Sequence, residues 1–584
     1  MKLFLAIMLS LTVFEVNADA LNLYADSAHA PFYLGVASGD PTSTGVIIWT
    51  HLTTSLPEAT VGYEVATDSL FNFLVSSGSF ATNDSLDHTV KIDVSGLNSN
   101  TSYYYRFLFD NRFSAIGKTK TAPESSINNL IFAVVSCSSI YSGYFNAYRQ
   151  IANLTNLDGV IHLGDYIYDD MVTNEEVRVP DSLPVNPQNL ADWRRIHKFW
   201  LLDPDLRLVR QSHPFIQLWD NHDTDGLYFD CEESAEAFMN YIPVRQNPNN
   251  FQKIYRKLSY GNLVDILILD VALWRGIDSL TASEDSYLGN EQFNWFSNEI
   301  KNSTAKWKII GSQKMVNNWS IGAAFGGANQ NAWDGFPAER SRVLNLIDSN
   351  TIENVMFISG DSHVSMAADL PYTPYTTATY NQTTGEGSLC VEFAPPSVSR
   401  GNFDEKGIPE VLVNTLLQTS YQENKHHVYA ELIQHGYGLL RINQDSVRAQ
   451  FWYCDIEQIS ASNTLGKELI LMNGENHWKR NSTAPNAIRE GEKNGSTLLS
   501  KLYPNPANDE IQFDIKLEKP SDLHLSIDQV ATSKKISHYS SIIIPKVSDK
   551  HIIIPVQELP NGLYMLTVEC ENFYKAQLFI IHGH

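Results

Sequence analysis

The sequence predicts a chain built around an α/β catalytic domain, with a β domain on each side of it. Short alternating runs fill residues 19–123, long apolar strands alternate with helical segments from Asn128 onward, and a β pattern returns at Lys501. A chain of 584 residues is too long for a single hydrophobic core. We therefore expect five segments: a signal peptide over 1–18, a β-sandwich over 19–123, a catalytic domain over 124–478, a linker over 479–500 and a small all-β domain over 501–584.

The first residues have the pattern of a secretory signal peptide. Lys2 precedes an apolar run from Leu3 to Phe14, and the small residues near Ala18 are typical of a cleavage site. This run is too short to span a membrane, and no other stretch approaches the required length. We therefore expect an exported protein without a transmembrane segment.

The region after the signal peptide is expected to form a small β-sandwich. Its strands are separated by clusters of Gly, Asn, Asp and Ser, and they are predicted at Gly45–Trp49, Thr60–Val65, His88–Val94 and Ser102–Phe109. No cluster of catalytic residue types occurs here, so a structural or docking role is favoured.

The charge balance argues against nucleic acid as a stable partner. The chain carries 66 acidic and 42 basic residues, a formal net charge of -24, whereas binding to a phosphate backbone requires clustered Lys and Arg. The five cysteines are an odd number for an oxidising compartment. If Cys137 binds a metal, the other four allow one or two disulfides, and buried free thiols are an equally good interpretation.

The catalytic region begins with a predicted β-α-β unit. Ile131–Val135 and Val160–Leu163 have the length and composition of buried parallel strands, and Tyr144–Leu154 has helical spacing between them. The first strand is followed by Cys137, and the second by Asp165 and Tyr168. Ligands bind outside the carboxyl ends of strands in open α/β sheets. A thiolate, a carboxylate and a phenol at that edge form a plausible set of ligands for a highly charged cation.

Later strands also end in polar residues. The predicted strands are His213–Trp219, Val264–Leu269, Trp307–Gly311 and Val355–Ser359. Asn221 and His222 follow the first of them, where Asn can give a neutral oxygen ligand and His can donate a proton. Asp361 and His363 follow the last, at a spacing that places both side chains on one side of an extended chain. Because one carboxylate can bridge two cations, Asp165 completes the pattern of a metal-dependent phosphoesterase.

The motifs of this region occur in a fixed order: SCSSIYSGYF, HLGDYIYDD, LWDNHDTDG, DGFPAER, ISGDSHVSMAADL and EFAPPSVS. With Leu34–Pro41 and Ile47–Thr50 in front of them, they resemble the alkaline phosphatase D family of metallophosphoesterases over most of 20–455. The resemblance implies a calcineurin-like α/β sandwich, preceded by a fibronectin- or Ig-like β-sandwich.

The resemblance also implies a centre of iron(III) with calcium. Cys137, Asp165, Tyr168 and His363 would hold the iron, and Asp165, Asn221 and Asp361 would hold calcium or another divalent ion, with Asp165 as the bridge. A metal-bound hydroxide would then attack phosphorus in line with the leaving alkoxide.

Two departures from the family pattern bear on the site. The third motif of the family is usually Asp-Asp-His-Glu, but in this chain it is Asp220-Asn221-His222-Asp223. Asn221 in place of an aspartate removes one negative charge. The family has an Asp-x-Arg-x-x-Arg motif at a strand end, and this chain lacks the first arginine of the motif because Ala272 occupies that position. Arg275 and Arg340 remain candidate phosphate contacts, because Arg binds phosphate oxygens bidentately, and a structural role is an equally good interpretation of each.

The C-terminal segment resembles a type IX secretion sorting domain. Tyr503–Pro506, a short β-sandwich pattern and Gly562–Tyr564 match such domains. The resemblance implies transit through the periplasm of a Gram-negative bacterium, then secretion or display at the cell surface, with the type IX machinery as a partner. An accessory β domain that binds a surface partner is the alternative.

The sequence therefore favours an exported phosphatase that hydrolyses phosphate monoesters or diesters. One alternative is a dedicated phosphodiesterase of wall polymers or phospholipids. A different class of alternative is a surface-binding protein without catalysis, which the missing arginine at Ala272 keeps open. The presence of every proposed metal ligand argues against that last interpretation.

Overall fold

The computed structural model describes residues 27–172, 176–178, 185–224, 231–273, 286–320, 332–480 and most of 498–581. The predicted signal peptide, most of the predicted linker and Arg275 lie outside the described residues. The chain divides into two compact units, one with residues 1–407 and 420–480, the other with residues 408–419 and 481–584.

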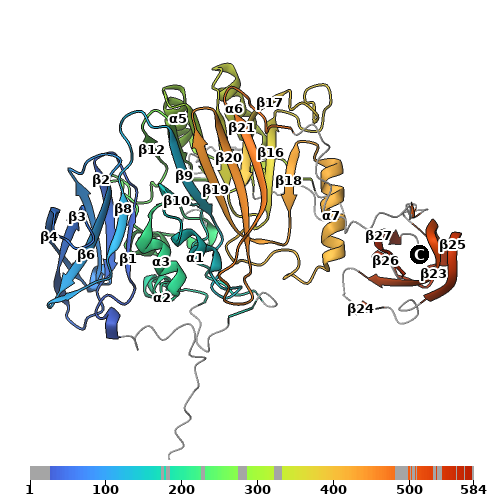
Figure 1. Cartoon of the computed structure of the whole chain (residues 1–584), viewed down its shortest axis with the longest axis horizontal. Helices are drawn as coiled ribbons and strands as arrows, with labels where there is room; N and C mark the ends of the chain where they lie inside the picture. Colours follow the sequence, from blue (N-terminus) through green and yellow to red (C-terminus); the bar gives the residue numbers. More distant parts are fainter. Residues whose placement is uncertain are drawn as a thin grey trace, which may run out of the picture. The chain divides into compact units, whose positions relative to one another are not determined.

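A nine-stranded sheet contains the predicted β-α-β unit. The strands β9 (Asn129–Val135), β10 (Gly159–His162) and β11 (Pro214–Gln217) are parallel neighbours, and helix α1 (Asn146–Ala152) connects the first two. The predicted strands and helix are therefore confirmed, with the helix shorter than expected. On the other side of β9, the sheet continues with three antiparallel strands that were not predicted from the sequence: β19 (His435–Asn443), β20 (Ser446–Cys454) and β21 (Thr464–Met472) (Figure 1).

A seven-stranded sheet contains the other strands predicted in the catalytic region. Its order is β12-β13-β14-β15-β17-β16-β18, and β13, β14, β15 and β17 run parallel. The bounds are β12 Arg256–Tyr260, β13 Val264–Ile268, β14 Trp307–Ser312, β15 Val355–Ser359, β16 Ser365–Pro371, β17 Ser388–Ala394 and β18 His427–Glu431.

The two sheets pack face to face because their strands are apolar on both sides. On β14, Ile309 belongs to the hydrophobic cluster shared with the nine-stranded sheet, and the next residue, Ile310, belongs to the cluster on the opposite face. That opposite face is covered by α5 (Gly289–Lys301) and α6 (Pro337–Ser349). The main cluster also takes side chains from α1, α2 (Leu190–Trp200), α3 (Pro204–Ser212) and α4 (Glu232–Tyr241). The result is a mixed α/β fold in which alternate side chains of each central strand face different layers.

The N-terminal strands lie in two sheets that share a hydrophobic cluster, and one of these sheets continues into the catalytic region. Strand β1 (Val36–Gly39) pairs in parallel with β11, and β2 (Gly45–His51) and β5 (Thr89–Ser95) extend the nine-stranded sheet from there. A second sheet contains β3 (Glu58–Ala66), β4 (Leu74–Asn83), β6 (Ser102–Phe109), β7 (Arg112–Phe113) and β8 (Gly117–Lys120). A Cβ at Gly39 would lie 2.8 Å from the Phe215 oxygen, so glycine permits this junction. Strands from both sides of the expected boundary at residue 123 therefore belong to one continuous sheet.

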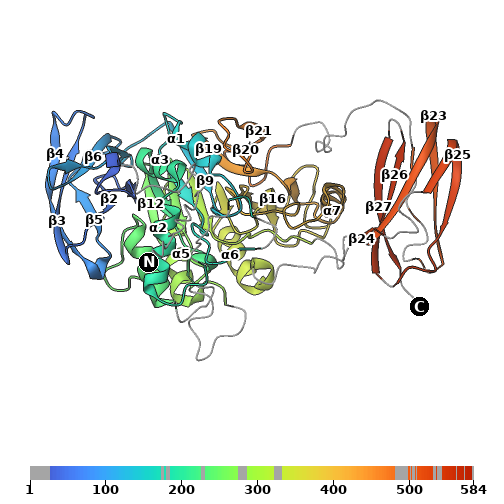
Figure 2. The same ribbon diagram turned by 90° about the horizontal axis from the view of Figure 1, so that it is seen from below.

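The C-terminal unit contains a six-stranded sheet, whose long strands are seen in Figure 2. The strands are β22 (Leu498–Leu499), β23 (Glu510–Gln529), β24 (Lys534–Lys535), β25 (Ile542–Pro555), β26 (Gly562–Cys570) and β27 (Phe573–Ile581). Its core includes Ile511, Leu525 and Leu566. The predicted β pattern is confirmed, although Tyr503–Pro506 lies outside the described residues.

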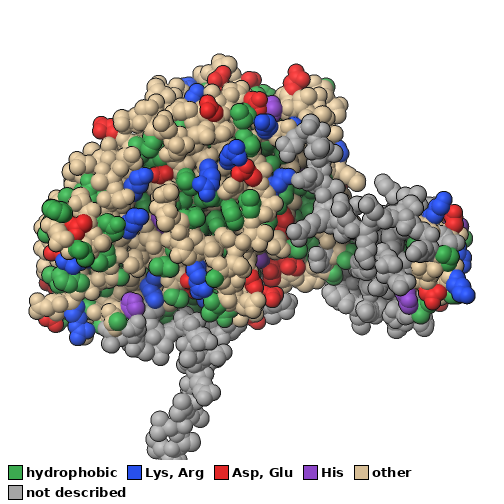
Figure 3. Space-filling model, in the orientation of Figure 1, with side chains coloured by type: hydrophobic (Ala, Val, Ile, Leu, Met, Phe, Trp, Pro, Cys, Tyr) green, Lys and Arg blue, Asp and Glu red, His purple; other side chains and the backbone are tan. Residues whose placement is uncertain are grey.

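The remaining elements are short, apart from α7 (Glu410–Glu423). They are the 3-10 helices η2 (Ser27–His29), η3 (Asp84–Leu86), η4 (Asn221–Asp223) and η6 (Trp333–Gly335). None of the helices in the described part of the chain is long and apolar enough to span a membrane. Cys137, Cys390 and Cys454 are buried free thiols, and Cys231 is buried. On the face in Figure 3, Lys and Arg side chains lie scattered among Asp and Glu.

Candidate metal centre

The candidate site lies where strand ends of the two large sheets meet. Cys137 and Asp165 follow β9 and β10 in one sheet, and Asp361 follows β15 in the other. The sheets approach closely at this point, because a Cβ at Gly360 would lie 3.0 Å from the Cβ of Ser136. The backbone thus brings together three segments that are far apart in the sequence, as the strand-end argument predicts.

Four of the candidate ligands have strained backbones. The φ angles are 58° at Cys137, 51° at Asp165, 64° at Asp361 and 63° at His363, in the left-handed region that non-glycine residues seldom adopt. Such strain costs about 1–3 kcal/mol at each residue and concentrates at ligand sites. Other residues, such as Asp110 and Asn111, also have positive φ, so the strain supports a ligand site at these four positions together with their side-chain chemistry.

Cys137, Asp165, Tyr168 and His363 form the first group of donors, which we call the thiol group. Cys137 Sγ lies 3.8 Å from Asp165 Oδ2, which accepts a hydrogen bond from the Tyr168 hydroxyl at 3.2 Å. The same hydroxyl lies 3.4 Å from His363 Nε2. One ligand atom each from Cys137, Asp165 and His363 lies within 4.8 Å of the other two, a spacing that suits one metal ion. The structure therefore brings together four residues that the sequence analysis proposed.

His363 is oriented as a metal-ligating histidine would be. Its Nδ1 lies 3.0 Å from the carbonyl oxygen of Gly401, so Nδ1 carries the proton and donates it there. This tautomer leaves the lone pair on Nε2, which faces Tyr168. Burial lowers the pKa of His363 to about 3, with a further contribution from Lys406, so the imidazole stays neutral. A carbonyl partner on the far nitrogen is the usual support of a histidine ligand.

Burial shapes the electrostatics of the thiol group. Burial raises the pKa of Cys137 well above its usual value, and the neighbouring Asp165 carboxylate raises it further. The same two causes raise the pKa of Tyr168. A thiolate and a phenolate therefore require a cation beside them, and thiolate, phenolate and imidazole donors suit a transition metal. The residues present fit a bound metal ion.

Asp165, Asp220, Asn221 and Asp361 form a second group of oxygen donors, which we call the oxygen group. One carboxylate oxygen from each of the three aspartates lies within 4.8 Å of the other two. Lys314 lies among them, with Nζ 2.7 Å from Asn221 Oδ1 and 2.9 Å from Asp220 Oδ2. Burial would lower the pKa of Lys314, but the Asp220 and Asp361 carboxylates outweigh it and raise the pKa, so the ammonium stays charged.

Neither Lys314 nor Asp220 was predicted from the sequence as a site residue. Asp220 was named only as part of the motif after β11, and Lys314 stands two residues beyond the end of β14. The signal that could have found Lys314 is its position after a predicted strand that is parallel to the strands bearing the ligands.

His222 lies at the exposed side of the centre. Its backbone N–H donates to Asp165 Oδ1 at 3.2 Å, and its Nδ1 lies 2.6 Å from Asp169 Oδ1. The ring lies 4.3 Å from that of Tyr168, between ring centroids. Burial would lower the pKa of His222, but the Asp165 and Asp169 carboxylates outweigh it and raise the pKa to about 9. A charged imidazole beside the donors can bind an anionic substrate.

The sequence left two roles open for the arginines of the region, a phosphate contact and a structural role. Arg340 is buried, and its guanidinium donates to the carbonyl oxygens of Val316, Pro371 and Tyr372, contacts that favour the structural role. Arg275 lies outside the described residues. Arg400, which the sequence analysis missed, lies over the Tyr168 ring at 4.3 Å.

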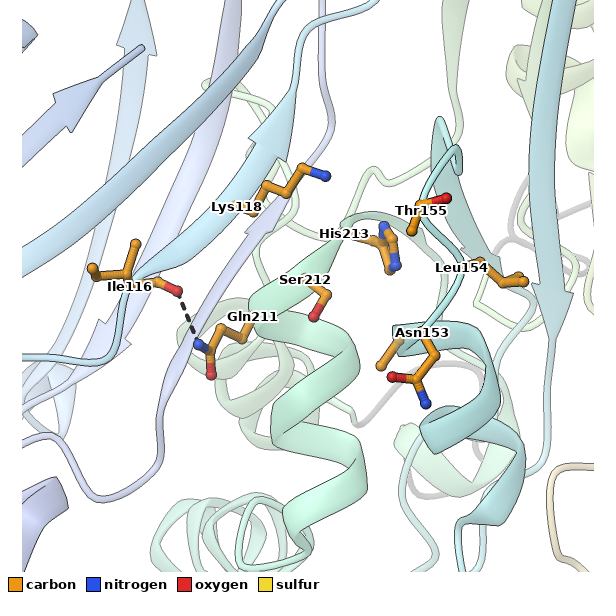
Figure 4. Close-up of a pocket in the computed structure, with 9 residues that line it drawn as sticks. Ile116, Lys118, Asn153, Leu154, Thr155, Gln211, Ser212 and His213 are labelled. Carbon is orange, nitrogen blue, oxygen red and sulfur yellow. Dashed lines mark hydrogen bonds between the residues drawn. The ribbon is translucent and has the colours of Figure 1, made fainter. Parts of the chain in front are cut away.

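A pocket elsewhere in the larger unit offers no comparable chemistry. Figure 4 shows its lining, where Gln211 donates a hydrogen bond to the Ile116 oxygen at 2.9 Å. Its two basic side chains are Lys118 and His213, and no acidic or thiol group lines it among the described residues. We therefore place the candidate site at the strand ends.

Comparison with family models separates the chain into three regions. Residues 132–451 match the model of PhoD-like phosphatase, and residues 18–123 match the model of the PhoD-like phosphatase N-terminal domain. Residues 501–582 match the model of the secretion system C-terminal sorting domain.

Individual proteins agree with these matches. Alkaline phosphatase D of Bacillus subtilis is 34% identical over 414 residues, which are 63% of this chain and 70% of the relative. A solved structure of PhoD has a TM-score of 0.68 at 26% identity, and the match covers 79% of this chain and 93% of that one. A glycosyl hydrolase family 2 member from Bacteroides cellulosilyticus has a TM-score of only 0.23 at 9% identity, over 94% of this chain and 78% of its own.

Proposed function

Because the chain belongs to the PhoD-like phosphatase family and is a phosphoric ester hydrolase, we propose that it is an exported, metal-dependent phosphatase that acts at the strand ends described above. The observation that carries this proposal is the thiol group, in which four chemically different donors lie together and three of them have strained backbones. The layered sheets support a calcineurin-like α/β sandwich, and the strands β1–β8 support a fibronectin- or Ig-like front part that shares a sheet with it.

We assign the thiol group to iron(III). Cys137, Asp165, Tyr168 and His363 would hold the ion, because thiolate, phenolate and imidazole suit a transition metal better than calcium. When bound, the metal supplies Lewis-acid activation of water and of the phosphoryl group. The expected calcium ligands Asp165, Asn221 and Asp361 belong to the oxygen group, in which Lys314 also lies.

His222 is the residue of this chain that we assign to the substrate. Its Nδ1 is held by Asp169, so Nε2 is the nitrogen that remains to face a phosphoryl oxygen or the leaving group. Hydrolysis breaks one phosphorus–oxygen ester bond and adds water across it, and the departing alkoxide needs a proton. A charged His222 can give that proton or hold the phosphoryl oxygen in place.

The C-terminal segment is a secretion system C-terminal sorting domain. We propose that it directs the chain through the type IX machinery of a Gram-negative bacterium, after transit through the periplasm, to the medium or the cell surface. An enzyme at that location would release phosphate from external esters. The net charge of -24 argues against nucleic acid as a stable partner.

The test uses the purified full chain with a chromogenic phosphate monoester and the matching diester. We expect turnover that a chelator abolishes and that added metal restores. Asp165→Ala should abolish it while leaving the far-ultraviolet circular dichroism spectrum unchanged. Exclusive turnover of the diester would favour a phosphodiesterase of wall polymers or phospholipids. Metal-independent turnover, or normal turnover by Asp165→Ala, would overturn the proposal.

A further inference from the structure

Hydrogen bonds to the backbone and to the neighbouring residue hold Lys314 in the oxygen group. The carbonyl oxygen of Lys314 accepts a hydrogen bond from Ser312 Oγ at 2.8 Å. The side chain of Gln313 donates to the Trp219 oxygen at 3.0 Å and accepts from the Val271 N–H at 3.0 Å, so the residue before Lys314 is tied to two neighbouring segments. Lys314 itself is buried. Its position is thus determined by the ends of the strands and not by solvent.

The ammonium of Lys314 contacts oxygens of the oxygen group, which a second cation would use. It donates to Asn221 Oδ1 at 2.7 Å, forms an ion pair with Asp220 Oδ2 at 2.9 Å, and contacts Asp361 Oδ1. The ammonium thus donates hydrogen bonds to Asn221 and Asp361, and its contact with Asp220 is an ion pair. Asn221 and Asp361 are two of the three residues expected to hold calcium.

A divalent cation and this ammonium do not fit the oxygen group together. Calcium takes six to eight oxygen ligands at about 2.3–2.6 Å, so an ion bound to Asn221 and Asp361 would lie within a few ångströms of Nζ. Two like charges at that separation in a buried site repel strongly, and burial leaves little water to screen them. The lysine would have to leave the group, which would also break its ion pair with Asp220.

We propose that Lys314 takes the place of the second cation in this chain, so that the centre holds one metal ion, in the thiol group, beside a built-in ammonium. This inference deepens the proposed function and rests on it. Lys314 is a positioning residue: it holds Asn221 and Asp361 in place and supplies positive charge next to the metal. The oxygen donors of the second group then fit an ammonium better than calcium in this chain, which differs from the expectation drawn from the family resemblance.

The test counts metal ions in the full chain and measures calcium binding directly. The protein is loaded with iron, dialysed against calcium and passed over a desalting column, then analysed by mass spectrometry of the elements. We expect about one iron and no retained calcium per chain in the wild type, and no calcium heat in isothermal titration calorimetry. Two cations per chain in the wild type would overturn the inference, and this result needs no variant.

Two substitutions sharpen the test. Lys314→Met removes the ammonium and keeps the length of the side chain, so calcium retained per chain should rise from none to about one. Lys308→Met, within strand β14 and with Nζ near the Glu353 oxygen instead, should retain none. If Lys314→Met folds and retains no calcium, Lys314 is not what excludes it, and the inference fails. If Lys314→Met does not fold, Lys314→Gln serves the same purpose.

Activity separates this inference from the proposed function. If the chain hydrolyses neither ester with its metal bound, the proposed function fails, while the metal count still decides about Lys314. If the chain hydrolyses esters and retains two cations, only the inference about Lys314 fails.

Discussion

The carboxylate of Asp223 holds the backbone of the loop that carries Asp165, 58 residues earlier in the chain. Its Oδ1 accepts from the N–H of Tyr166 and of Ile167, both at 3.1 Å, and its Oδ2 accepts from the N–H of Asp220 at 2.9 Å. The loops after β10 and β11 are therefore joined by a single buried side chain. The position of the Asp165 carboxylate therefore depends on a residue that is not one of the candidate ligands.

Asp223→Ala should weaken metal binding without removing a ligand. The substitution leaves three buried N–H groups without their acceptor, at about 1–3 kcal/mol for each one that finds no other partner. Loss of such outer support typically costs about 10–100-fold in metal affinity, and competition with a chelator of known affinity would measure it. Asp84→Ala, at a carboxylate that is 76% exposed, is the matched control and should leave the metal affinity unchanged. Unchanged metal affinity in Asp223→Ala would show that the loop is held by other contacts.

Tyr168→Phe should remove a colour from the iron-loaded protein. A phenolate bound to iron(III) gives a charge-transfer band in the visible spectrum, and the Tyr168 hydroxyl is the phenol that lies among the donors. Tyr166→Phe is the control, because Tyr166 is equally buried but its hydroxyl accepts from Arg210 instead. We expect the band to vanish only in Tyr168→Phe, with reduced iron content. A colourless wild-type protein with iron bound would refute the assignment of Tyr168.

His222→Asn should lower kcat and leave the metal content unchanged. A side chain that transfers a proton to the leaving group typically contributes about 10²–10⁴-fold to the rate, and asparagine cannot supply that proton. Elemental analysis and steady-state kinetics on the same preparation would separate the two effects. Asp169→Asn, which removes the charge that holds His222 Nδ1, should give a smaller loss of kcat. A parallel loss of iron and of kcat in His222→Asn would instead make His222 a structural support of Asp165.

The central strands, and the fact that the thiol-group residues lie together, could be predicted from the sequence because both depend on local patterns. Continuous apolar runs such as Val355–Ser359 can hardly be anything but buried strands, and polar residues just beyond them must lie at the sheet edge. Parallel neighbours then bring Cys137 and Asp165 together, as the register of β9 and β10 shows. Position after a strand was sufficient for these residues.

Contacts between distant segments were not predictable in the same way. Arg340 stands in a motif that suggested a phosphate contact, and only the tertiary structure turns its guanidinium to backbone oxygens. Lys314 could be a solvent-exposed lysine by any local criterion, and its burial among carboxylates depends on the packing of one sheet against the other. The pairing of β1 with β11 likewise joins regions that the sequence pattern separates.

Buried neutral histidines should make the larger unit sensitive to acid. His197 on α2 stacks on Tyr241 with ring centroids 5.2 Å apart, and neither of its ring nitrogens has a hydrogen-bond partner among the described residues. Burial, with Arg210 nearby, lowers its pKa from 6.5 to about 3. Above pH 6.5 the ring is neutral in both states, but below it the unfolded chain binds a proton that the folded chain refuses. The free energy of unfolding therefore falls as the pH falls from 6.5 towards 3.

His197→Phe should remove this part of the pH dependence and keep the stack on Tyr241. Between pH 8 and pH 4.5 one such histidine costs about 2.7 kcal/mol, so the variant should gain that amount over the wild type at the lower pH and little at pH 8. Urea unfolding followed by tryptophan fluorescence measures it, because all 11 tryptophans precede residue 481 and the signal reports the larger unit alone. Ile196→Val, at a buried neighbour on the same helix, should lower stability by about 0.5–1.5 kcal/mol equally at both pH values. Equal pH dependence in His197→Phe and wild type would mean that His197 binds its proton in the folded state as well.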